Sequence, residues 1–236
     1  MKKRLTNIFL IMIVTTLAGF VPMSAYAQDP SVADILAEAA AQLEETESMA
    51  FTMELEGTTY VDGAESIKLE GAEGVMQRPD KVDVTFTAEV LGTQQISIRM
   101  ITVGEDAWIT DIVTGKWVTS PPEFGYNPSV LYDPEDGLAP LMEKMTDKKV
   151  EGSEEIDGRD AWHITAEVDG EVINTMTSGT MHGSSQSVEL WIDKETHDLL
   201  RIKIAEPTDE DIEDPATWIL TLSKHNEDVT IEDPTS

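Results

Sequence analysis

The sequence predicts an α+β fold, in which one curled antiparallel sheet is accompanied by few helices. From residue 51 onward, apolar and polar residues alternate in run after run, which is the period of half-buried strands. Short turns rich in Gly, Pro and Asp separate these runs, so neighbouring strands are expected to form antiparallel hairpins. Several runs are long and contain interior glycines, which favours a sheet that twists and curls.

The first 27 residues predict a signal peptide. Three basic residues near the start precede an apolar run over 8–21, and Ala25-Tyr26-Ala27 before Gln28 has the form that signal peptidase cuts. The run is shorter than the roughly 20 residues of a membrane-spanning helix. We therefore expect cleavage between Ala27 and Gln28, with a retained anchor as the alternative. The product would be an exported, extracytoplasmic protein, secreted or in the cell envelope, with one domain over 28–236.

A single long helix is expected at the start of this domain. Asp29 offers a capping carboxylate before Pro30, which suits a first helical turn. Apolar residues then return every three or four positions, at Val32, Ile35, Leu36, Ala39 and Leu43.

After the helix, two sets of strands are expected, and one irregular segment separates them. The first set is expected at 51–56, 67–76, 82–90, 96–100, 107–112 and 116–119. Residues 120–149 break the pattern with several prolines and then return to helical spacing at Leu138, Leu141, Met142 and Met145. The second set is expected at 161–168, 188–192, 199–205 and 217–223, with polar loops at 179–187 and 209–214.

The charge of the chain limits its partners. It has 236 residues, 16 Lys+Arg and 46 Asp+Glu, for a formal net charge of −30. Nucleic acid is excluded as a partner, because phosphate binding needs concentrated Lys and Arg. Attraction to anionic lipid surfaces by simple charge is excluded for the same reason. The chain contains no cysteine, which excludes disulfides, thiolate metal sites and cysteine nucleophiles.

No catalytic or metal-binding motif stands out. The four histidines, His163, His182, His197 and His225, lack metal-ligand spacing, and there is no nucleophile elbow, phosphate loop or dinucleotide turn. The acidic loops at 133–137 and 209–214 lack the spacing of an EF-hand. We therefore expect no enzyme, no metal and no cofactor. A further alternative is a hydrolase acting on envelope glycolipids. It would need a clustered pair of acidic residues, and no such pair stands out in the sequence.

Five motifs, in the right order, resemble the LppX/LprG family of bacterial envelope lipoproteins. Residues 75–82 resemble its G-x-V-x-R-P-D-K/R turn, and 188–193 resemble its V-x-V-W-I-D strand. The other three are Tyr132-Asp133-Pro134 with Gly137-Leu138, the stretch 149–158, and the closing segment 220–234. One departure is Leu17-Ala18-Gly19-Phe20, which resembles a lipobox with Phe20 in place of the lipid-bearing Cys, so this chain cannot be anchored through that residue.

The resemblance implies a fold like that of the LolA lipoprotein carrier, a half-barrel sheet with helices covering an apolar cavity. Family members bind acyl lipids and glycolipids and help to move them across the envelope. The resemblance therefore implies an exported lipid carrier that holds acyl chains, contacts membranes only transiently and works as a monomer. An acyl-chain lipid or glycolipid and a membrane transporter would be its partners.

Alternation and resemblance together predict the residues that line the cavity. The strand residues are Phe51, Met53, Leu55, Val84, Phe86, Ile98, Met100, Ile164 and Leu190, and the residues of a lid over 120–149 are Leu131, Leu138 and Met142. The alternative is the same sheet around a solid core, acting as an envelope interaction or sensor module without lipid. A continuous apolar void larger than the roughly 300–1,000 Å³ of drug-sized pockets would favour two or more acyl chains.

Overall fold

The computed structural model describes residues 30–60, 66–121, 128–135, 137–177, 179–208 and 214–235. Its strands are β1 (Ser48–Tyr60), β2 (Ile67–Gln77), β3 (Lys81–Val90), β4 (Gln94–Val103), β5 (Asp106–Thr110), β6 (Trp117–Thr119), β7 (Thr146–Ile156), β8 (Arg159–Asp169), β9 (Ser185–Asp193), β10 (Leu199–Ala205) and β11 (Thr217–Ser223). Its helices are α1 (Val32–Glu45), α2 (Leu138–Lys144) and α3 (Gly170–Met176), with a 3-10 helix η2 (Pro128–Tyr132).

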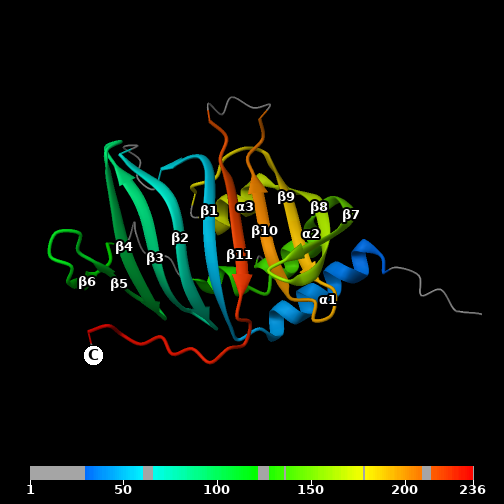
Figure 1. The fold of residues 1–236 in the computed structure, drawn as a ribbon, viewed down its shortest axis with the longest axis horizontal. Helices are drawn as coiled ribbons and strands as arrows, with labels where there is room; N and C mark the ends of the chain where they lie inside the picture. Colours follow the sequence, from blue (N-terminus) through cyan, green and yellow to red (C-terminus); the bar gives the residue numbers. More distant parts are fainter. Residues whose placement is uncertain are drawn as a thin grey trace, which may run out of the picture.

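All eleven strands belong to one antiparallel sheet. Their order is β6-β5-β4-β3-β2-β1-β11-β10-β9-β8-β7. Every pair of neighbouring strands is consecutive in the chain except β1 and β11, and β6 and β7 form the two edges. The three helices lie behind the β8–β11 part of the sheet, while β2 to β5 have no α-helix over them (Figure 1). This arrangement confirms the predicted α+β class.

Helix α1 begins with a capping box formed by Ser31 and Asp34. The Ser31 hydroxyl accepts the backbone N–H of Asp34 at 3.2 Å, and the Asp34 carboxylate accepts the backbone N–H of Ser31 at 3.2 Å. The sequence favoured Asp29 as the cap, but this residue lies outside the described residues. The apolar stripe packs as expected, because Ile35, Leu36, Ala39 and Leu43 are the buried residues of the helix.

Two elements were not predicted from the sequence. Strand β7 is exposed along most of its length, because it is the outermost strand of the sheet, and it is rich in Lys, Asp and Glu. Such an edge strand shows no apolar alternation. Helix α3 has only seven residues, too few to display helical periodicity, and it begins where the Asp169 carboxylate accepts the N–H of Glu171 at 2.8 Å.

One apolar core joins the helices to the sheet. It includes buried residues of α1, α2 and α3 together with residues of β1 to β4 and β8 to β11. After β11 the chain has no further strand among the described residues, and 224–235 run extended beneath the ends of β1 to β4 (Figure 1). There Ile231 is buried, and its carbonyl accepts from Lys81 Nζ at 3.3 Å.

The predicted signal peptide and its cleavage site between Ala27 and Gln28 lie outside the described residues. Within the described ranges, none of the helices combines the length and the apolar character that crossing a bilayer requires.

Candidate functional site

An apolar cavity of about 320 Å³ lies against the face of β1 to β5 that points toward the helices. Its wall is built by alternate residues of these strands, so that each strand contributes one face. Residues of the chain between β6 and α2, of α3 and of β11 complete the wall. The lining residues are Phe51, Met53, Ile67, Leu69, Ala72, Met76, Val82, Val84, Phe86, Ala88, Ile98, Met100, Ile109, Leu131, Met176, Thr177, Thr180, Trp218 and Leu220.

A second, smaller chamber of about 110 Å³ lies between the helices and the other half of the sheet. Its wall includes residues of α2, β9, β10 and β11. The two chambers share Met76, Leu131, Met176, Thr177, Trp218 and Leu220. The two chambers therefore adjoin each other at these residues.

Gly74 of β2 leaves room for the ring of Phe51 from the neighbouring strand β1. Phe51 of β1 and Val84 of β3 are both register partners of Gly74, one on each side. A Cβ atom on Gly74 would lie 3.0 Å from Phe51 Cζ and closer still to the backbone of Asp83. The absent side chain therefore lets the Phe51 ring lie across the sheet at the edge of the larger chamber.

The predicted lining residues divide into four groups. Those in the larger chamber are Phe51, Met53, Val84, Phe86, Ile98 and Met100. Leu131 lines both chambers, and Leu138, Met142 and Leu190 line the smaller one. Leu55 packs against the core without lining either chamber, and Ile164 is fully buried within the core.

Trp218, Leu220 and Met176 were missed although they line both chambers. The strand over 217–223 was predicted, but its position beside β1 depends on residues more than a hundred positions apart. Met176 belongs to the helix that the sequence did not predict. A period-two assignment of the inward face of β11 could have found Trp218 and Leu220, which alternate along it.

The polar side-chain groups of the cavity wall already have partners within the protein: the Trp218 indole N–H donates to Thr59 Oγ1 at 3.2 Å, and two hydroxyls donate to the main chain. Among the described residues, its only hydroxyls are those of Thr177 and Thr180. Thr177 Oγ1 donates to the carbonyl of Ile173 at 2.9 Å, and Thr180 Oγ1 donates to that of Thr177 at 2.6 Å. No carboxylate, imidazole or amine of the described chain lines either chamber, so the wall offers shape and apolar surface.

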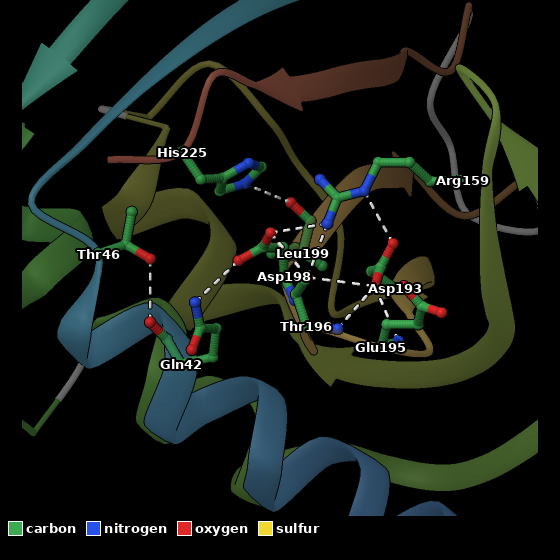
Figure 2. Close-up of polar contacts among 9 residues, drawn as sticks. All are labelled: Gln42, Thr46, Arg159, Asp193, Glu195, Thr196, Asp198, Leu199 and His225. Carbon is green, nitrogen blue, oxygen red and sulfur yellow. Dashed lines mark hydrogen bonds and ion pairs between the residues drawn. The ribbon is translucent and has the colours of Figure 1, made fainter. Parts of the chain in front are cut away.

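The charged cluster around Arg159 lies apart from both chambers and fixes α1 to the sheet. Arg159 donates to the carboxylates of Asp193 at 2.8 Å and Asp198 at 2.7 Å, and Gln42 of α1 donates to Asp198 at 2.9 Å (Figure 2). Burial raises the pKa of Asp198, but hydrogen bonds from Arg159, Thr196 and Gln42 outweigh this effect and lower it. The pKa of Asp193 is lowered too, because backbone N–H groups and Arg159 outweigh its burial.

None of the four histidines lines either chamber in the part of the chain that the structure describes. His163 stacks on Trp191 with ring centroids 4.5 Å apart, and its ring nitrogens face Glu189 at 2.7 Å and Glu154 at 3.1 Å. None of its partners lines either chamber. Across the described ranges, no group of three or more His, Cys, Asp or Glu side chains is arranged to hold a metal ion.

The fold and the cavity define a class of protein in which a long antiparallel sheet and a few short helices surround an apolar hollow. The chain belongs to the LppX_LprAFG lipoprotein family, whose model matches residues 30–231. The family is one of lipoproteins, whereas this chain contains no cysteine.

Two relatives agree with this assignment, and a solved structure shares the fold. The lipoarabinomannan carrier protein LprG of Mycobacteroides abscessus is 31% identical over 110 residues, which are 46% of this chain and 46% of that protein. The protein of the same name from Mycolicibacterium smegmatis is 22% identical over 212 residues, covering 87% of this chain and 84% of that protein. The crystal structure of LprF from Mycobacterium bovis has a TM-score of 0.67 at 18% identity, covering 87% of this chain and 98% of that one. At this identity the structural likeness shows the fold alone.

Proposed function

We propose that the protein is an extracytoplasmic lipid carrier, which holds the acyl chains of a lipid or glycolipid in its cavity. The observation that carries this proposal is the chemistry of the wall. A 320 Å³ hollow lined almost entirely by Val, Ile, Leu, Met, Phe and Ala side chains has no side-chain polar group to offer except two hydroxyls and the Trp218 indole N–H, which already donate within the protein. An acyl chain needs only such a wall.

The same wall argues against a catalytic role. A hydrolase acting on glycolipids needs a pair of carboxylates or an activated nucleophile beside the bound substrate. The lining residues of the described chain include no acid and no base. Binding and release, without a chemical step, are therefore the proposed activity.

The affinity for cargo is proposed to come from shape more than from the hydrophobic effect. Burying a methylene gains about 0.8 kcal/mol relative to water, but a lipid taken from a bilayer is already buried. Methionine fills irregular space in many conformations. Met53, Met76, Met100 and Met176 line the larger chamber, so its wall is suited to chains of different length.

The volume of the cavity suggests that loading widens it. At about 320 Å³ the larger chamber lies at the lower end of the roughly 300–1,000 Å³ of drug-sized pockets, and not beyond that range. A lipid with two acyl chains would need the 110 Å³ chamber as well. We propose that the shared residues, Met176 and Leu131 in particular, move aside to join the two chambers.

The segment 120–149 is the proposed lid. Its η2 contributes Leu131 to both chambers, and its α2 contributes Leu138 and Met142 to the smaller one. Residues 146–149 belong to β7 and pair with β8, so only the part before β7 can move as a lid; its opening would uncover the cavity without breaking the sheet.

The cargo is proposed to be a glycolipid or another acyl lipid, because two relatives are named lipoarabinomannan carriers. A sugar head group would remain outside a wall of this kind. A membrane transporter is a further proposed partner. With no cysteine, the protein would work in the envelope, or outside it, without an acyl anchor on a Cys.

Native mass spectrometry of the exported protein, purified without detergent, tests this function. We expect a reproducible bound mass that solvent extraction identifies as an acyl lipid or glycolipid. A protein that is empty, and that stays empty after incubation with envelope lipids, would contradict the proposal and favour an interaction or sensor module.

A further inference from the structure

A continuous row of apolar positions crosses the sheet from the larger chamber to the edge strand β6. Each member is the register partner of the next on the neighbouring strand, in the order Phe51, Gly74, Val84, Met100, Ile109 and Val118. Directly paired residues of antiparallel strands lie on the same face of a sheet. Every side chain of the row as far as Ile109 lines the chamber, so Val118 lies on the chamber face as well. We call these six residues the apolar row.

The exposure of the apolar row increases toward the edge of the sheet. Met100 is 1% exposed, Ile109 is half-buried, and Val118 is 42% exposed. Val118 is the middle residue of the three-residue strand β6, and its neighbours point to the opposite face because side chains alternate along a strand. The apolar surface of the chamber therefore continues over β5 and β6 until it meets solvent.

The wall of the chamber is incomplete beside this row. Strand β4 pairs with β3 over Gln94–Val103, but β5 pairs with β4 only over Met100–Val103. Among the described residues, no strand adjoins the first part of β4 on its outer side. Ile98, which lines the chamber from that part, is only half-buried, and no α-helix lies over these strands (Figure 1). In the part of the chain that the structure describes, the chamber is thus open toward the β4–β6 side.

The larger chamber is too small to hold a long acyl chain completely. A methylene group takes up about as much space as a water molecule does in the liquid, roughly 30 Å³, so about ten of them fill 320 Å³. The rest of a longer chain must enter the smaller chamber or lie outside. The first path passes Met176 and Trp218, which line both chambers, whereas the apolar row is already exposed at Val118.

We propose that the part of a long acyl chain that exceeds the larger chamber lies along the apolar row and leaves the protein over Val118. The inference rests on the proposed function, because it assigns a path to the same cargo. The row carries no charged or hydrogen-bonding side chain, as a chain of methylene groups requires. Val118 would then select for chain length: it touches the end of a long chain and never meets a short one. A second acyl chain would still need the smaller chamber.

Two single-chain lipids that differ only in length test this path. The exported protein, freed of bound lipid, is titrated in a calorimeter with decanoyl or octadecanoyl lysophosphatidylcholine below the concentration at which each forms micelles. Val118→Gln should weaken binding of the octadecanoyl lipid about fourfold or more, since one methylene group returned to water costs about that factor. Binding of the decanoyl lipid should not change. Val118→Leu keeps the surface apolar and should bind both lipids as the unmodified protein does.

Val150→Gln is the matched control. Val150 is also 42% exposed, and it lies on β7, the opposite edge strand of the same sheet. Its register partner Ile164 is fully buried and lines neither chamber, so Val150 shares the exposure and the edge position of Val118 but not the connection to the cavity. Glutamine at this position should leave the binding of both lipids unchanged.

The outcomes separate the path from the carrier function. Weaker binding of the octadecanoyl lipid alone, confined to Val118→Gln, supports the path. If Val118→Gln binds both lipids as the unmodified protein does, or loses both equally, the path is wrong and the carrier function stands. If the unmodified protein binds neither lipid, the path and the carrier function fail together.

A label at Val118 provides a second readout that does not depend on affinity. Because the chain has no cysteine, Val118→Cys can carry a single polarity-sensitive fluorophore, and Val150→Cys is again the control. The octadecanoyl lipid should shift the emission of the label at Val118 to the blue, and the saturating decanoyl lipid should not. Equal shifts with both lipids, or equal shifts at both positions, would overturn the proposal.

Discussion

The guanidinium of Arg78 lies over the ring of Tyr132, with its Cζ 4.0 Å from the ring centroid. The same guanidinium donates to the carbonyl of Thr46 at 2.7 Å and to that of Leu43 at 2.8 Å. Arg78 follows β2, and Tyr132 ends η2. The two carbonyls belong to the last turn of α1 and to its C-cap, and that turn has no basic residue of its own. One cation therefore joins the first helix, the sheet and the proposed lid.

Replacing Arg78 should loosen all three elements together. Arg78→Met removes two hydrogen bonds that a charged group donates. It also removes the positive charge that offsets the negative charges of Glu44 and Glu45 at the helix C-terminus. We expect the free energy of unfolding to fall by about 2 kcal/mol, measured by urea denaturation. Arg78→Lys should recover only part of the loss, because an ammonium cannot reproduce the planar fork that meets both carbonyls and stacks on the ring.

Arg99→Met is the matched control for this prediction. Arg99 likewise lies near an aromatic ring, with its Cζ 5.6 Å from the ring centroid of Trp117, but it pairs with a carboxylate, that of Asp83, and its side chain is 50% exposed. Exposed ion pairs contribute about 1 kcal/mol or less. Equal losses for the two variants would contradict the role assigned to Arg78.

Tyr132 should make the protein sensitive to alkali. Burial raises the pKa of its phenol to about 12, although the charge of Arg78 acts in the opposite direction. In the unfolded chain the pKa is about 10. The folded state then holds the proton more tightly, so its contribution to stability is complete below about pH 10 and is lost as the pH rises through about 12.

Tyr132→Phe tests this linkage. The phenol oxygen is buried and has no hydrogen-bond partner among the described residues, so its removal should cost little at neutral pH while the ring remains over Arg78. The loss of stability between about pH 10 and pH 12 should become smaller than in the unmodified protein. Parallel curves of urea midpoint against pH for the two proteins would contradict the prediction.

The Arg159 cluster should make the protein sensitive to acid. The pKa of Asp198 and that of Asp193 are lowered in the folded state, so the stabilisation they provide is complete above the unfolded pKa of about 4 and is lost as the pH falls further. Asp198→Asn keeps the shape of the side chain but cannot carry the charge that pairs with Arg159 (Figure 2). We expect this variant to be less stable at neutral pH and to show a shallower decline below about pH 4, measured by urea denaturation. An equally steep decline would show that the cluster does not supply the acid-sensitive stability.

The sequence predicted the cavity wall best where one strand could be treated alone. The alternation of Phe51 with Met53 and of Val84 with Phe86 identifies one face of each strand, and antiparallel pairing brings those faces together. Ile164 was assigned to the correct, buried face, yet the hollow does not extend to it, because the helices fill that part of the sheet. Packing decides which part of a curled sheet is filled by helices and which part is left open. Alternation along a strand carries no information about that packing.

Trp218 illustrates the other limit. Its indole lines both chambers and donates to Thr59 Oγ1 at 3.2 Å, which ties β11 to β1. No local sequence pattern predicts that a strand starting at residue 217 lies beside one starting at residue 48. The same holds for Arg78 and Tyr132, whose motifs were noticed separately and whose contact was not predicted.

Ile98 provides the sharpest test of the cavity. It lines the larger chamber from β4 and is only partly buried, so Ile98→Gln should leave the protein folded. An acyl chain against a glutamine would strip water from an amide that has no partner in this apolar wall, at a cost of about 1–3 kcal/mol. We therefore expect the protein to lose roughly tenfold or more of its affinity for lipid. Quantification of co-purified lipid by mass spectrometry measures this loss.

Ser97→Gln is the control, because Ser97 precedes Ile98 on the same strand and its side chain is exposed on the opposite face. A glutamine there meets solvent and should leave the lipid content unchanged, while any general effect of glutamine on β4 would appear in both variants. If both variants kept their lipid, the cargo would lie outside the β1–β5 chamber. If both lost it to the same extent, the loss would come from the strand and not from the wall. Only a loss confined to Ile98→Gln identifies the inward face of β4 as the surface that touches the acyl chain.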